Sequence, residues 1–178
     1  NLCEDGLNLI RAEFDIQNCL IERTKGDGFD ADFCRGIFAR ATFRNTGNDC
    51  IDFSGSVVTI SDITGENSGD KAISAGERAW LTISNVYVDG AITGLASKDD
   101  SRLIGDQITV KNAEVGLAVF QKKPEYNSSS MTLSGVQFQN LGQFGLIEKG
   151  SQAEVAGKTY RGYQKFDIEK LYARFEKN

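Results

Sequence analysis

The sequence of 178 residues contains no histidine. Without an imidazole there is no Ser-His-Asp triad, no His-ligated zinc or haem and no His general base, so any catalysis must use carboxylates, Lys, Tyr or Cys. Proline is nearly absent too, since Pro124 is the single proline beside 19 glycines. We therefore expect many tight turns that are formed without proline.

Basic charge is also scarce, with 20 basic against 25 acidic residues and a formal net charge of −5. Because Lys and Arg supply most of the affinity for phosphate backbones, no nucleic-acid partner is expected. No stretch approaches the roughly 18 apolar residues of a membrane span, so no such span is expected either. A composition of 40% hydrophobic and 25% charged residues suits one globular domain with a core.

The beginning of the chain and its cysteines carry little signal. The start, Asn1-Leu2-Cys3-Glu4, has neither an initiator Met nor a basic-then-apolar leader, and we expect the chain to be a fragment of a longer protein. Its four cysteines lie in the first 50 residues and form no CxxC pair, which disfavours a thiolate zinc site. Disulfides and buried free thiols both remain open.

The sequence repeats with a period of 22 residues. An apolar residue recurs without slip at Leu7, Phe29, Ile51, Ile73, Leu95 and Leu117. A seventh copy, Phe144-Gly145-Leu146, comes 29 residues after the sixth, which predicts seven looped-out residues at 121–127. A second recurring position, five or six residues before the apolar column, favours left-handed turns and bonding along a stack; it is occupied by Asn45, Asn67, Asn112 and Asn140.

A unit of this length can bury its apolar face only by stacking on its neighbours. A β-sandwich is the alternative, but it has no reason to keep a strict register over six copies. The repeat therefore predicts an all-β fold, a right-handed parallel β-helix (solenoid) of about seven coils over residues 1–152. Residues 153–178 are predicted to form a C-terminal cap, with helical apolar spacing at 166–175. The first coil is uncovered, so a covering segment or partner is expected there.

Stacking coils about 4.8 Å apart places equivalent side chains in ladders. Like charges stacked directly destabilise a sheet, so the ladder of Asp5, Asp27 and Asp49 and that of Asp30 and Asp52 call for an explanation. The carboxylates could accept hydrogen bonds from backbone N–H groups in turns. They could instead bind Ca²⁺, or serve a polysaccharide site with a lysine for anionic sugars.

Other residues near these ladders are weaker candidates. Lys122 and Tyr126 lie in the predicted insertion, which overhangs the same strand region and would hold an anionic chain by charge and stacking; a solvated loop is the default interpretation. Trp80 opens a predicted strand, and packing in the core or at an edge is expected for it rather than a role as a sugar platform.

The repeat, which covers nearly the whole chain, resembles the right-handed β-helix, or pectin-lyase-like, superfamily. Residues 25–30, Lys-Gly-Asp-Gly-Phe-Asp, are similar to the Asn-Thr-Asp-Gly-Phe-Asp segment of polygalacturonase-type glycoside hydrolases, and residues 47–51, Gly-Asn-Asp-Cys-Ile, resemble their Gly-Asp-Asp-Cys-Ile. Residues 71–76 and 94–98 fall where that family has Gly-His-Gly and Arg-Ile-Lys. By this resemblance Asp49 would be the general acid, Asp27 would activate water, and Lys98 would contact a substrate carboxylate.

Three positions depart from that pattern, with Asn48 in place of an aspartate, Lys71 in place of the histidine and Ala96 in place of the arginine. The prediction is therefore an extracytoplasmic domain that binds or processes a polysaccharide, either without standard hydrolase chemistry or by β-elimination with a Lys base. The candidate catalytic residues are Asp27, Asp49 and Lys71. The candidate substrate-binding residues are Asp30, Asp52, Ser74, Lys98, Lys122 and Tyr126. No cofactor is expected apart from the Ca²⁺ interpretation, and the alternative function is a structural or adhesive solenoid that presents loops to a protein partner.

Overall fold

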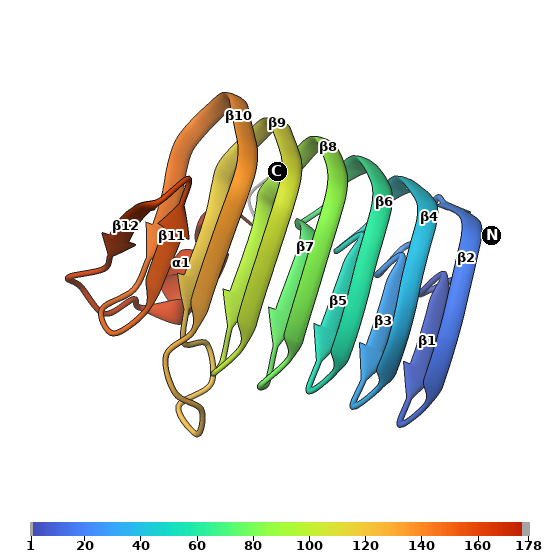
Figure 1. The fold of residues 1–178 in the computed structure, drawn as a ribbon, viewed down its shortest axis with the longest axis horizontal. Coiled ribbons are helices and arrows are strands. Elements are labelled where there is room, and N and C mark those ends of the chain that lie inside the picture. Colours follow the sequence, from blue (N-terminus) through green and yellow to red (C-terminus); the bar gives the residue numbers. More distant parts are fainter. Residues whose placement is uncertain (1, 176–178) are drawn as a thin grey trace.

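In the computed structural model, which describes residues 2–175, the chain forms a parallel β-solenoid of about seven turns with a repeat of about 22 residues (Figure 1). This confirms the fold predicted from the repeat. The strands are β1 (Leu7–Ile10), β2 (Glu13–Glu22), β3 (Phe29–Asp32), β4 (Arg35–Thr46), β5 (Ile51–Ser54), β6 (Val57–Ser68), β7 (Lys71–Gly76), β8 (Trp80–Lys98), β9 (Arg102–Phe120), β10 (Ser130–Ile147), β11 (Gln152–Val155) and β12 (Lys158–Arg161), and the helix is α1 (Ile168–Phe175).

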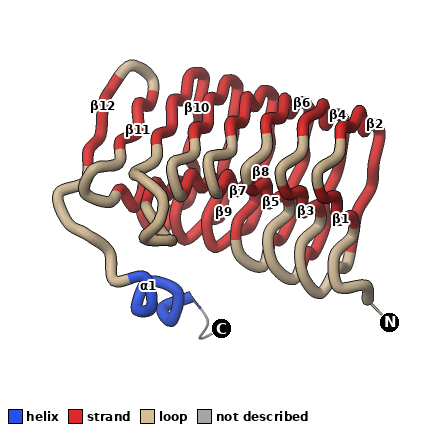
Figure 2. The backbone as a smooth tube through the Cα atoms, turned by 90° about the horizontal axis from the view of Figure 1, so that it is seen from below, coloured by secondary structure: helices blue, strands red, loops and turns tan. Residues whose placement is uncertain are grey.

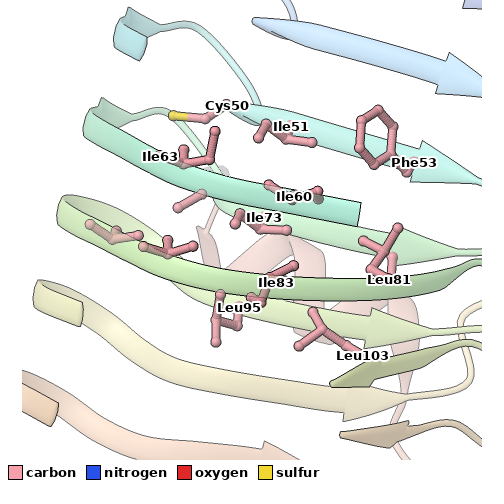
Figure 3. Packing of buried hydrophobic residues seen from close by; sticks show 14 of the residues in the cluster. Cys50, Ile51, Phe53, Ile60, Ile63, Ile73, Leu81, Ile83, Leu95 and Leu103 are labelled. Atoms are coloured by element: carbon pink, nitrogen blue, oxygen red, sulfur yellow. The ribbon is translucent and has the colours of Figure 1, made fainter. Parts of the chain in front are cut away.

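The register between coils follows the repeat. Phe29 of β3 lies between Leu7 of β1 and Ile51 of β5, and Leu95 of β8 lies between Ile73 of β7 and Leu117 of β9. From the second coil to the sixth, these side chains are fully buried, as the sequence predicts for the apolar column. Alternate residues of each strand therefore point into one continuous core along the solenoid axis (Figure 3).

Corners of the coils recur as columns of residues with positive φ. At one corner Asn45, Asn67, Asn112 and Asn140 have φ of 54°, 56°, 51° and 51°. The Asn67 amide donates a hydrogen bond to Oδ1 of Asn45 over 3.1 Å, and the Asn140 amide donates to Asn112. Asparagine tolerates this left-handed conformation better than most residues. The predicted asparagine turns, bonded along the stack, are therefore confirmed.

Aromatic side chains fill the core of the first three coils. The ring of Phe29 contacts those of Phe38, Phe53 and Phe14, with centroid separations of 4.9, 5.0 and 5.5 Å. Its arrangement with Phe53 is edge-on, a geometry that aromatic pairs favour. Aliphatic residues take over in later coils (Figure 3).

The insertion before the last full coil is six residues long, not the predicted seven. Ser130 pairs with Arg102 and Gly145 pairs with Leu117, both at a spacing of 28 residues. Gly145 therefore takes the inward column, and a Cβ there would lie 2.8 Å from Cδ1 of Leu117. Leu146, which we expected in that column, instead packs on the outside with residues of α1. An outward apolar residue buried by a distant helix looks the same in sequence as an inward one.

The predicted C-terminal helix is present as α1, and it begins after Asp167, whose carboxylate accepts the N–H of Lys170 over 3.2 Å. The apolar side of α1 packs on the outward side of strands β8 to β10, against Ala96, Ala118 and Phe120. The helix thus lies beside the coils, while the β11–β12 hairpin follows the last one (Figure 2). No helix within residues 2–175 has the length and apolar character needed to cross a membrane.

The four cysteines are free thiols, so the structure contains neither of the disulfides that an even count permits. Cys34 and Cys50 are buried, whereas Cys3 is exposed. The Cys34 sulfur accepts the N–H of Ala12 over 3.3 Å, and its own N–H donates to Oγ of Ser56 over 2.8 Å. Cys34 therefore contributes to the bonding between successive coils.

Candidate functional site

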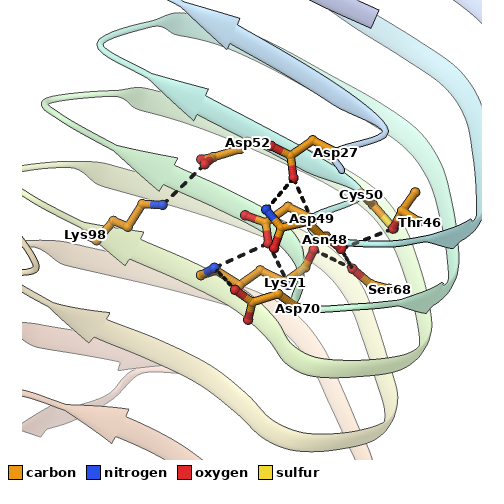
Figure 4. A network of polar contacts seen from close by, with 10 residues as sticks. All are labelled: Asp27, Thr46, Asn48, Asp49, Cys50, Asp52, Ser68, Asp70, Lys71 and Lys98. Atoms are coloured by element: carbon orange, nitrogen blue, oxygen red, sulfur yellow. Dashed lines mark hydrogen bonds and ion pairs between the residues drawn. The ribbon is translucent and has the colours of Figure 1, made fainter. Parts of the chain in front are cut away.

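The predicted Asp5–Asp27–Asp49 ladder bonds successive coils together. Oδ1 of Asp5 accepts the N–H of Asp27, and Oδ1 of Asp27 accepts the N–H of Asp49, each over 2.8 Å. Oδ1 of Asp49 accepts the N–H of Lys71 over 2.9 Å (Figure 4). The backbone-bonding interpretation therefore holds for these carboxylates, with the donor one coil further on. Asp27 also accepts the side-chain amide of Asn48 on the same oxygen.

Lys71 forms a buried ion pair with Asp49. Its Nζ lies 3.3 Å from Oδ1 of Asp49 and also contacts the carboxylate of Asp70 (Figure 4). Burial raises the pKa of Asp49 to about 7, although the ammonium of Lys71 opposes this. Burial alone would lower the pKa of Lys71, but Asp49 and Asp70 outweigh it and raise that pKa above its usual value. Lys71 is therefore held as an ammonium group, which is the wrong form for a general base.

A cavity of about 310 Å³ opens beside this ion pair. It gathers five of the predicted site residues, which are Asp49, Asp52, Lys71, Lys98 and Lys122. The remaining lining residues are Asn48, Gly69, Asp70, Ile92 and Tyr172. Strands β5, β7 and β8, the insertion and helix α1 all contribute, so the cavity exists only because α1 docks on the side of the solenoid.

The lysines of the cavity differ in their partners. Nζ of Lys98 lies 3.4 Å from Asp52, and this side chain is almost fully buried. No carboxylate within residues 2–175 lies within ion-pair distance of Lys122, whose Nζ instead lies 4.7 Å from the centre of the Tyr172 ring. Partial desolvation lowers the pKa of Lys122, and the ammonium groups of Lys98 and Lys71 lower it further. Lys122 is thus a cation that repels its neighbours and lacks a counter-ion.

Three buried polar atoms around the cavity have no hydrogen-bond partner. They are Oδ2 of Asp49, Oδ1 of Asp52 and the hydroxyl oxygen of Tyr172. A buried acceptor without a donor costs about 1–3 kcal/mol relative to a satisfied one. The cavity therefore offers two unsatisfied carboxylate oxygens, one phenol and an unpaired ammonium group to whatever enters it.

The other predicted site residues lie outside this cavity. Asp27 is one coil away, and Asp30 accepts the side-chain amide of Asn8 over 2.7 Å. Ser74 is fully buried. The Tyr126 hydroxyl donates to Glu77 over 3.3 Å, and its ring lies beside the Arg78 guanidinium. Within residues 2–175 no cluster of three or more Cys, Asp or Glu side chains is arranged to hold a metal ion, so the structure lends the calcium interpretation no support.

Asp30 makes the stability of the protein depend on pH. Burial raises its pKa from 3.8 to about 7, and the charges of Asp32 and Asp52 add to this. Because the folded pKa exceeds the unfolded one, the native state binds the proton more tightly, and stability rises as the pH falls from about 8 towards 4. The groups with lowered pKa, Asp62 and Asp167, lose their contribution only as the pH falls to 3.8 and below.

We therefore expect a higher melting temperature at mildly acidic than at mildly alkaline pH, by a few degrees. The Asp30→Asn variant should lose most of this difference and melt higher than the parent at alkaline pH. Thermal melts followed by circular dichroism at both pH values test this. The matched control is Glu114→Gln, which neutralises an exposed carboxylate outside the cluster and should keep the parent's pH dependence. An unchanged pH dependence in Asp30→Asn would contradict the prediction.

Sequence reasoning missed Tyr172, Asp70 and Ile92 as residues of the cavity. Tyr172 was expected only to pack near the cap, and the helical spacing carried no signal for the surface on which α1 docks. The expectation for Trp80 is wrong, because its side chain is 49% exposed and lies against the Arg102 guanidinium. Its strand position predicts this, since Trp80 pairs with Val57 in an outward column.

Comparison of the chain with protein-family models, with curated proteins and with solved structures finds no match. The register and burial of the chain itself establish the parallel β-solenoid.

Proposed function

We propose that the cavity beside Lys71 binds a segment of an acidic polysaccharide without cleaving it. The observation that supports this most is the set of unpartnered polar groups around the cavity. Oδ2 of Asp49 and Oδ1 of Asp52 need donors, which sugar hydroxyls supply. Lys122 needs an anion, which the carboxylate of a uronic acid supplies.

Simpler ligands fit the same groups less well. A small inorganic anion would satisfy Lys122, but its oxygens would face the carboxylates of Asp49 and Asp52 without donating to them. A neutral sugar would satisfy the two carboxylates and leave Lys122 without a counter-ion. An acidic sugar carries both kinds of group, and the motif resemblance to polygalacturonase-type enzymes supports the same ligand class. A ligand of this kind also favours an extracytoplasmic location.

Binding without cleavage follows from the state of the predicted catalytic groups. Glycoside hydrolysis uses two carboxyl groups that flank the scissile bond. Asp27 does not reach the cavity, and the Oδ1 oxygens of Asp27 and Asp49 are held by backbone N–H groups. Lys71 is kept protonated, and Ala96, where the family has an arginine, is covered by α1. These features argue against both hydrolysis and lysine-based elimination.

Calorimetric titration with a galacturonic acid oligosaccharide tests this proposal. We expect saturable binding to the parent, an affinity lowered about tenfold or more by Lys122→Ala, and no effect of Lys111→Ala, which removes a lysine over Tyr87 outside the cavity. Binding should strengthen as the pH falls from about 8 to 6, because protonation of Asp49 removes a negative charge beside the ligand.

A neutral cello-oligosaccharide serves as the ligand control and should bind more weakly than the acidic one. Absence of saturable binding by the acidic oligosaccharide, or equal losses in Lys122→Ala and Lys111→Ala, would rule out an acidic polysaccharide at this cavity.

A second candidate, an adhesive solenoid with a protein partner, rests on a row of exposed apolar side chains on the β4–β6–β8 face. Ile37, Val57 and Trp80 are 47%, 40% and 49% exposed. Trp80 is the only tryptophan, so quenching of its fluorescence by acrylamide reports on this row. A sugar in the lysine cavity should leave this quenching unchanged, whereas a partner on the row should reduce it.

A further inference from the structure

The first coil exposes one complete edge of the solenoid. Within residues 2–175, β1 pairs only with β3 and β2 pairs only with β4. The inward side chains of this coil, such as Leu9, Phe14 and Ile16, are only partly buried, whereas Ala31 and Phe38 in the next coil are fully buried. The edge therefore combines unpaired backbone groups with incompletely covered core residues, a combination that favours association with another strand.

The opposite end is formed by the β11–β12 hairpin. In the described residues, β12 pairs only with β11, and so presents an unpaired outer edge. Tyr160 stacks on Phe144 with centroids 4.8 Å apart, and these rings line a cavity of about 520 Å³ together with Tyr163, which is 84% exposed. This end is thus aromatic, and it too has a free strand edge.

The two ends carry opposite charge. Residues 2–23 contain five acidic and two basic side chains, whereas residues 149–165 contain four basic and one acidic. Two first coils placed edge to edge would oppose like charges, and so would two β12 strands. Contact between the first coil of one copy and β12 of another brings unlike charges together, so the charge distribution favours this arrangement over either symmetric one.

The register of the solenoid shows which residues would meet. Arg161 pairs with Gln152, and the same column runs back through successive coils to Arg35 and Glu13. The neighbouring column runs from Tyr160 back to Phe14 through the same pairs. A second copy that continued the stack beyond β12 would therefore place its Glu13 opposite Arg161 and its Phe14 opposite Tyr160.

We propose that this chain associates head to tail with a second copy of itself, the β2 edge of one copy pairing antiparallel with the β12 edge of the next. The contact joins Glu13 to Arg161 and Phe14 to Tyr160, and it buries the aromatic cavity at the C-terminal end. Because the two surfaces differ, the contact is heterologous, and unless the rotation closes a ring each copy added leaves both kinds of edge free. The assembly therefore grows as a linear series of solenoids.

Sedimentation velocity of the intact chain over a wide range of concentration tests this. We expect an average mass that rises with concentration and falls at high salt. The charge reversals Glu13→Arg and Arg161→Glu should each weaken association by about tenfold. An equimolar mixture of the two variants should assemble again, because every head-to-tail contact then pairs unlike charges. The double variant should likewise recover self-association.

The matched control is Glu114→Arg, the same reversal at an exposed position on the side of the solenoid, which should associate like the parent. Circular dichroism confirms that each variant retains the β fold. A parent that stays monomeric at all concentrations overturns the proposal. Association that is lost in Glu13→Arg but kept in Arg161→Glu also overturns it, since that result indicates a symmetric contact between first coils.

Discussion

Replacing Phe29 by alanine is expected to lower the free energy of unfolding by about 4 kcal/mol. Phe29 is fully buried, and its ring contacts those of three other phenylalanines. Backbone pairing on both sides of β3 restricts collapse of the cavity that the substitution leaves. Urea denaturation followed by circular dichroism measures the change.

Phe33→Ala provides the matched control for this prediction. Phe33 follows β3 by one residue, but its side chain is 52% exposed, so the same truncation should change the free energy of unfolding by less than about 1 kcal/mol. Equal losses in the two variants would show that the aromatic cluster of the first coils does not carry the stability that its packing implies.

Replacing Asp49 by alanine is expected to lower the free energy of unfolding by about 3 kcal/mol. The substitution leaves the buried ammonium of Lys71 with Asp70 as its remaining ion-pair partner, and it leaves the backbone N–H of Lys71 without its acceptor. Asp49→Asn retains an oxygen for that N–H and should lose distinctly less. Urea denaturation of the two variants separates the charge from the hydrogen bond.

The double variant Asp49→Asn/Lys71→Met is the decisive comparison. Removing both charges eliminates the buried ion without a partner, so this variant should be more stable than Asp49→Ala. If it is less stable, the ion pair itself stabilises the solenoid, and the argument from an unpaired buried charge is wrong.

The fold was predictable because its physical basis is local and periodic. An apolar residue every 22 positions requires stacking, and the asparagine corners repeat with nearly the same period. The length of the insertion was not, because both Gly145 and Leu146 are compatible with a column that tolerates small or apolar residues. Only the observed pairing of Gly145 with Leu117 decides between them.

The candidate site was predictable only in part. The ladders correctly placed Asp49, Asp52, Lys71 and Lys98 on neighbouring coils, because equivalent positions stack. They also implied exposed lysines, and this is wrong, since Lys71 and Lys98 are both buried. The helix that covers them lies about a hundred residues further along the chain, and its amphipathic spacing does not specify the surface on which it docks.

The position of α1 also affects how the solenoid unfolds. In a stack of repeats each coil normally contacts only its two neighbours, so stability is a sum of local terms and the ends fray first. Helix α1 and the segment before it touch Ala96 of β8, Phe120 of β9 and Leu146 of β10, while Tyr172 lies against Lys71 of β7. These coils cannot open singly without releasing the helix. The C-terminal half should therefore open as one cooperative unit, whereas the coils formed by β1 to β4 open in sequence from their free edge.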